Sequence, residues 1–168
     1  PDKNKRIGGG YLGRKNTILE GIEYLLNANY PVQSKKINDM KAALTTAKTL
    51  LTEEKYLDDE SELTEAAAKF EKAARSIHVF RRMPEIAESD DPAVKDLMNR
   101  AVTEMQAFNL FISPGFLKDQ ITYYKEDMDR RLAGPNELMH ELEEMMAPFN
   151  TVDEFGEKET LTSGDIYE

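Results

Sequence analysis

The chain has 168 residues and a net charge of -10, and it contains no cysteine. This length suits one domain with tails, and the lack of cysteine excludes a disulfide framework, a cysteine nucleophile and a cysteine-ligated zinc site. No apolar run approaches the roughly 20 residues of a membrane span, so we expect a soluble protein, with the cytoplasm as the favoured compartment.

The amino-terminal segment is basic and rich in glycine. Residues 1–15 include five basic residues, one acidic residue and four glycines. So many glycines disfavour a helix, so this segment is predicted to be a basic arm. Its candidate anion-binding residues are Arg6, Arg14 and Lys15. Because the chain as a whole repels nucleic acid, binding to DNA or RNA remains an alternative that depends on this arm.

Three helices are predicted to follow the arm. A capping box begins at Thr17 and predicts a helix that ends near Asn29. Ser34 precedes a second apolar stripe at steps of three and four residues, which runs to about Thr52. Asp59 begins a third helix, with acids in its first turn and bases in its last, which suits the helix dipole.

The second half of the chain contains two more residues that are typical of a helix start. Asp91 precedes a proline and begins a helix that ends near Phe111, and Ser113 begins the next helix in the same way. The short turn between them predicts an antiparallel hairpin. The sequence Ala133-Gly134-Pro135 predicts a break, followed by a short sixth helix over residues 136–146.

The predicted fold is therefore all-α. We expect an antiparallel bundle of four to five helices within residues 16–147, together with the short sixth helix. Residues 148–168 are acidic and poor in aliphatic side chains, which predicts a disordered tail. No alternation of apolar and polar residues is long enough to indicate a strand.

Two groups of apolar residues are candidates for a partner-binding surface. At the turn between the fourth and fifth predicted helices there are more large apolar side chains than one face of each helix can bury. The predicted sixth helix is acidic on one side and apolar on the other. The candidate residues at the turn are Phe108, Phe111, Ile112, Phe116 and Leu117. Those on the sixth helix are Leu138, Leu142, Met145 and Met146.

A catalytic constellation of comparable clarity is missing from the sequence. A di-metal carboxylate site needs two Glu-x-x-His units, and only Glu137 with His140 matches, since Arg75 stands three residues before His78. Glu20, Glu23 and Glu104 are further possible ligands, but all three are predicted to lie beside the apolar stripes of their helices. We expect no catalytic residue, metal site or cofactor.

These observations favour a non-catalytic helical module that binds another protein, as an adaptor, assembly factor or regulator. Three alternatives remain. The oppositely charged ends would allow a self-assembling structural subunit. The single Glu-x-x-His unit would suit a metal-carboxylate enzyme. The basic arm would suit a nucleic-acid-associated protein. Tyr167, which lies among acids near the carboxyl terminus, is a possible phosphorylation site.

Overall fold

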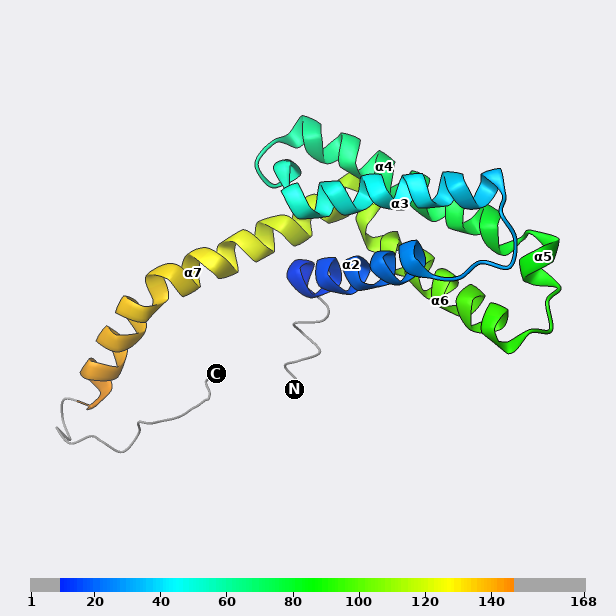
Figure 1. The fold of residues 1–168 in the computed structure, drawn as a ribbon. Coiled ribbons are helices and arrows are strands. Elements are labelled where there is room, and N and C mark those ends of the chain that lie inside the picture. The colour runs from blue at the N-terminus through cyan, green and yellow to red at the C-terminus, as the bar shows by residue number, and fades with distance from the viewer. Residues whose placement is uncertain (1–9, 147–168) are drawn as a thin grey trace. The chain divides into compact units, whose positions relative to one another are not determined.

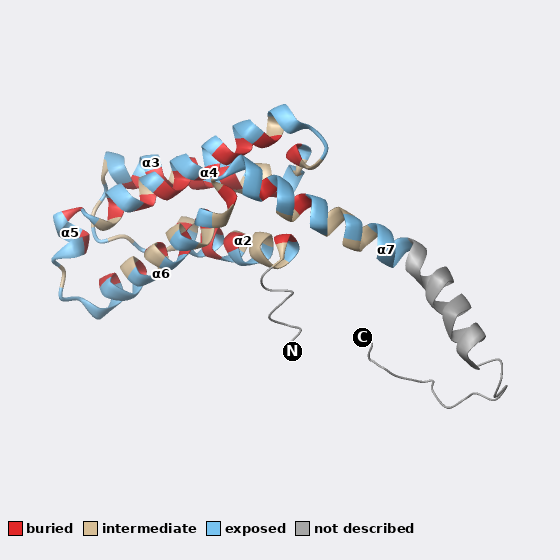
Figure 2. Cartoon of the chain, turned by 180° about the vertical axis from the view of Figure 1, so that it is seen from behind, coloured by how far each residue is buried: buried red, intermediate tan, exposed pale blue. Residues whose placement is uncertain are grey.

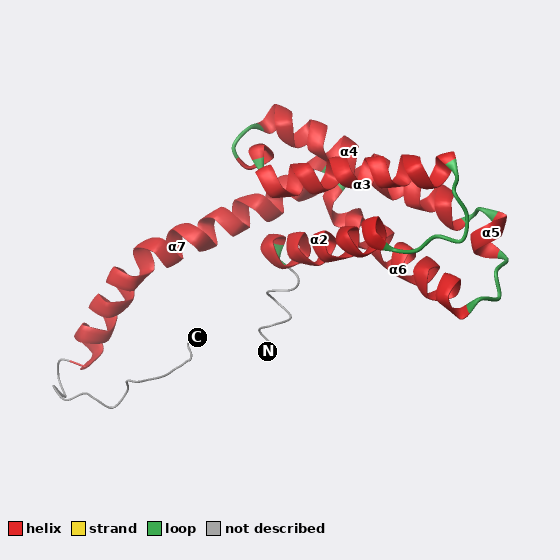
Figure 3. Ribbon diagram, in the orientation of Figure 1, coloured by secondary structure: helices red, strands yellow, loops and turns green. Residues whose placement is uncertain are grey.

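The structure is a computed structural model that describes the backbone of residues 10–146 and the side chains of residues 10–132. Over this range all regular elements are helices, which confirms the all-α prediction (Figure 3). The α-helices are α2 (Tyr11–Asn27), α3 (Lys35–Glu53), α4 (Glu60–Arg81), α5 (Pro84–Ala87), α6 (Pro92–Phe108) and α7 (Pro114–Met146). Two short 3-10 helices, η1 (Lys55–Leu57) and η2 (Asn109–Phe111), connect them.

The contacts divide the chain into two compact units, Pro1–Tyr124 and Lys125–Glu168. The boundary falls within α7. In the first unit, α2 packs against α3 and α6, and α4 packs against the same two helices from the other side. The chain direction alternates along these four helices, as Figure 1 shows. They therefore form an up-and-down bundle in which each helix has two neighbours.

Polar side chains cap the starts of α3, α4, α6 and α7 at the positions that the sequence predicts. Ser34 Oγ accepts a hydrogen bond from the backbone N–H of Lys36 at 3.1 Å, and Asp91 Oδ1 accepts one from Ala93 at 3.0 Å. Asp59 caps α4 and Ser113 caps α7 in the same manner. Each cap satisfies a backbone donor that has no partner inside its helix.

The predicted start of the first helix is wrong. Helix α2 begins at Tyr11, six residues before Thr17. Tyr11 is only 2% exposed, and its ring stacks on that of Phe111 at 5.7 Å between centroids. Because this packing offsets the low helix propensity of Gly13, residues 11–15 belong to the bundle rather than to an arm. The rest of the predicted arm, residues 1–9, lies outside the described residues.

The predicted break at Gly134-Pro135 is also wrong, because α7 is one helix of 33 residues. A proline inside a helix removes one hydrogen bond and crowds the preceding turn, and α7 continues through Pro135 in spite of this cost. Residues 136–146 are therefore the end of α7 and not a separate sixth helix. Helix α6 packs against α2 and α4, and the start of α7 enters the same core through Leu117 and Ile121.

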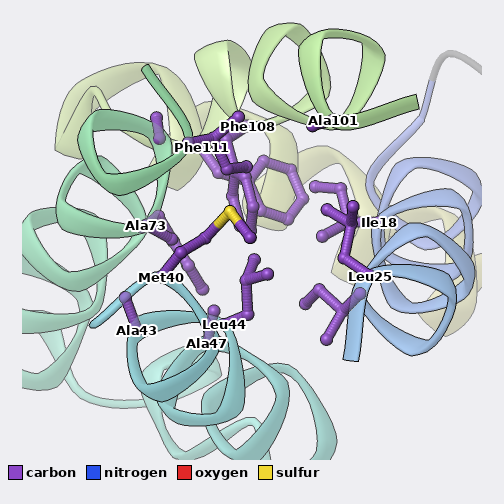
Figure 4. Packing of buried hydrophobic residues seen from close by; sticks show 14 of the residues in the cluster. Ile18, Leu25, Met40, Ala43, Leu44, Ala47, Ala73, Ala101, Phe108 and Phe111 are labelled. Atoms are coloured by element: carbon purple, nitrogen blue, oxygen red, sulfur yellow. The ribbon is translucent and has the colours of Figure 1, made fainter. Parts of the chain in front are cut away.

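The hydrophobic core lies between the four bundle helices, whose buried residues face inward in Figure 2. Figure 4 shows Met40 and Leu44 of α3 meeting residues of the facing helices in the middle of the bundle. The apolar stripes predicted for α2, α3, α4 and α6 supply most of this core. Their spacing of three and four residues explains why one face of each helix is buried.

The predicted tail, residues 148–168, and Tyr167 within it lie outside the described residues. No helix in the described part of the chain is long and apolar enough to cross a membrane.

Candidate functional site

The turn between α6 and α7 is covered by the bundle rather than exposed. Phe108, Phe111 and Leu117 are all fully buried. Phe70 of α4 lies 5.7 Å from Phe111 between ring centroids, and it also stacks on Phe108. The prediction that Phe108, Phe111 and Leu117 form a partner surface is therefore wrong, because the 3-10 turn η2 folds these side chains into the core.

Large apolar side chains are exposed on α7 instead. Phe116 is 45% exposed, Tyr123 is 74% exposed and Leu132 is 75% exposed. Ile112, at the end of η2, is half-buried against the core. Of the candidate residues at this turn, Phe116 is thus the most accessible to a partner.

The other partner candidates, Leu138, Leu142, Met145 and Met146, belong to the part of α7 whose side chains lie outside the described residues. Their backbone is helical and continuous with the first half of α7. Steps of three and four residues therefore place them along one stripe of the helix.

A hydrogen-bonded cluster ties the start of α2 to the end of α3. The hydroxyl of Tyr11 donates to Glu54 Oε2 at 2.6 Å and lies 2.7 Å from the hydroxyl of Tyr56. Lys15 Nζ donates to the same carboxylate oxygen at 2.9 Å. Burial, with the nearby carboxylate, raises the pKa of Tyr11 far above its usual value. The cluster therefore holds neutral phenols around one ion pair, an arrangement suited to structural support.

This cluster changes the interpretation of the predicted anion site. Lys15 is paired with Glu54, and both side chains are largely covered. The charge of this lysine is therefore already compensated by a carboxylate within the bundle. Arg14 lies in the first turns of α2, and Arg6 lies outside the described residues.

A buried carboxyl group lies between α6 and α2. Glu104 is 2% exposed, and a Cβ atom placed on Gly21 of α2 would lie 1.7 Å from its Oε1. The carboxyl thus occupies the space that a side chain at position 21 would need. Glu104 Oε2 is buried without a hydrogen-bond partner among the described residues. Burial raises the pKa of Glu104 to about 8, and the positive charge of Arg100 opposes this shift.

The sequence contains a pattern that predicts this burial. Position 104 follows Val94, Leu97 and Ala101 and precedes Phe108 at alternating steps of three and four residues. Such spacing places all five residues on one helix face. The expectation that Glu104 lies beside the apolar stripe is therefore wrong. Its position belongs to the apolar face of the helix, and only its charge suggested a location outside that face.

A surface hollow of about 470 Å³ lies between the end of α2 and the start of α6. Three of its polar members, Glu23, Tyr24 and Asn27, have partners within the protein. Glu23 pairs with Lys48 of α3, and Tyr24 lies beneath the guanidinium of Arg100 at 4.7 Å. These contacts use the polar groups within the protein, so the hollow lacks the convergent polar side chains that mark a small-molecule site.

The residues considered for metal binding do not form a group in the described part of the chain. No cluster of three or more His, Cys, Asp or Glu side chains there could hold a metal ion. His78 is exposed on α4, and the side chains of Glu137 and His140 lie outside the described residues.

The described residues form a helical bundle, and their last helix, α7, begins in the bundle and continues into the second unit. The chain matches no protein-family model, no curated protein and no solved structure.

Proposed function

We propose that this protein is a non-catalytic helical module that binds another protein through the second half of α7. The observation that carries the proposal is the exposure of Leu132, at 75%, on a helix that continues far beyond the residues it packs into the bundle. A helix in water gains most of its stability from packing an apolar face. A partner that covers this face would provide such packing.

The first half of α7 supports this interpretation by contrast. Leu117 and Ile121 are buried in the bundle core, and Tyr124 contacts the ring of Tyr11 at 5.1 Å. These contacts anchor the start of α7. The helix from Lys125 onward belongs to the second unit, in which α7 is the only described helix.

The bundle itself supports a structural role. Its buried polar groups lie between helices, as in the pair of Lys15 with Glu54 and the close approach of Glu104 to Gly21. Neither group faces the surface hollow between α2 and α6. Recognition is therefore assigned to α7 and not to the bundle.

A binding assay with matched variants tests the proposal. Full-length protein is immobilised and incubated with extract from its native source, in parallel with Leu132→Asp and Tyr123→Asp. Both positions are equally exposed, but Tyr123 lies away from the stripe that contains Leu132. We expect Leu132→Asp to capture less protein than the parent, because a carboxylate is costly to bury in an apolar contact. Tyr123→Asp should capture as much as the parent.

Circular dichroism provides the folding control, since both variants should keep the helical spectrum of the parent. Capture that is the same for Leu132→Asp and the parent would contradict the proposal.

A further inference from the structure

The sequence of the second half of α7 contains both an apolar stripe and an uneven distribution of charge. We propose that residues 125–146 pair with the same segment of a second copy of this chain, in antiparallel orientation. This inference rests on the proposed function, and it names the partner of the same helix.

The stripe continues directly from residues that pack in the bundle. Leu117, Ile121 and Tyr124 face the core at steps of four and three residues. The same helix face continues through Met128, which is half-buried, and then Leu132. The sequence repeats the pattern further along the helix at Leu138, Leu142 and Met145. The face that packs in the bundle thus continues to Leu132, and the sequence places further apolar positions six residues beyond it.

The distribution of charge along the segment sets the direction of such a pair. Residues 125–132 hold three bases and three acids, whereas residues 133–146 hold four acids and neither lysine nor arginine. A parallel pair would place four acids against four acids, which is unfavourable. An antiparallel pair places the acidic end of one copy beside the bases of the other.

The positions of the flanking charges agree with this direction. At 100° per residue, Lys125 and Glu143 lie on one flank of the stripe, and Arg131 and Glu141 lie on the other. Arg131 and Arg130 share the single carboxylate of Asp127, at 2.9 and 3.0 Å. Two guanidinium groups on one carboxylate leave positive charge available for the acids of a second copy.

A two-fold axis near Pro135 satisfies both patterns at once. It brings Met128 of one copy to Leu142 of the other, and Leu132 to Leu138. The same axis brings Lys125 close to Glu143 and Arg131 close to Glu141. Each contact occurs twice, as a symmetric pair of identical segments requires.

Sedimentation of the full-length chain tests the pairing. We expect a concentration-dependent dimer, which Leu132→Asp weakens at least about tenfold because two carboxylates enter the contact. Tyr123→Asp is the matched control and should leave the dimer unchanged, since position 123 lies away from the stripe. A monomer at every concentration, or a dimer that Leu132→Asp does not weaken, would overturn the proposal.

Cross-linking tests the direction, and the absence of native cysteine makes it specific. A mixture of the single variants Met128→Cys and Leu142→Cys should form a disulfide between copies. Met128→Cys alone should not, because its two copies would lie about 21 Å apart along the helix, beyond disulfide reach. A disulfide with Met128→Cys alone would indicate a parallel pair and overturn the proposal.

The two proposals fail in different ways. If the chain stays monomeric while it captures a different protein through Leu132, the self-pairing is wrong and the proposed function remains. If neither a second copy nor any other protein binds through Leu132, both are wrong.

Discussion

Glu104→Gln should remove a large part of the pH dependence of folding. The carboxyl of Glu104 is 2% exposed, and burial raises its pKa in the folded protein from 4.5 to about 8. Between these two values the unfolded chain has lost this proton while the folded protein keeps it. The associated stability is therefore complete below pH 4.5 and falls as the pH rises toward 8.

The magnitude follows from the size of the shift. Each pH unit within this interval lowers the free energy of unfolding by about 1.4 kcal/mol through this group. The loss reaches about 3 kcal/mol at pH 7 and about 5 kcal/mol above pH 8, relative to pH 4.5. A glutamine cannot ionise, so the variant should lack this contribution, although its amide retains a cost for unpaired burial.

Urea denaturation at intervals from pH 5 to pH 9 measures the effect. The free energy of unfolding of the parent should fall across this range more steeply than that of Glu104→Gln. Glu20→Gln is the control, because Glu20 is exposed on α2, and it should keep the slope of the parent. Parallel curves for the parent and Glu104→Gln would refute the reasoning, since the carboxyl would then titrate as it does in the unfolded chain.

Two further substitutions test the packing of α2. Gly21→Ala should destabilise the protein by about 1–3 kcal/mol, because the new methyl group meets the carboxyl of Glu104. Glu104→Ala in the same chain should recover much of this loss, whereas Gly115→Ala, which meets no atom within 4 Å, should not destabilise. Tyr11→Phe should cost about 1–3 kcal/mol through the lost hydrogen bonds of its hydroxyl. Exposed Tyr123→Phe should change stability by less than about 0.5 kcal/mol. Urea denaturation distinguishes all of these outcomes, and an equal effect of each variant and its control would contradict the packing described above.

The helix caps explain why most of the bundle could be predicted. Ser34, Asp59, Asp91 and Ser113 act on backbone groups within three residues of themselves. Their effect is local, so it can be recognised without knowledge of the rest of the fold. The apolar stripes are local in the same sense.

The candidate site depended on contacts that the sequence does not show directly. Phe111 was expected at an exposed tip, but it is buried because Tyr11 and Phe70 lie against it from two other helices. Glu104 was expected beside the core, but Gly21 leaves room for its carboxyl. In both cases the deciding neighbour is far away in the sequence.

The sequence by itself determined the all-α class, the four capped helix starts and the inward face of each bundle helix, because short-range hydrogen bonds and helical periodicity control these features. Only the tertiary structure decided that α2 begins at Tyr11, that a carboxyl is enclosed between α2 and α6, and that apolar residues of the turn are covered while Leu132 is exposed. The reason is that burial depends on which helices meet, and those meetings join residues from separate parts of the chain.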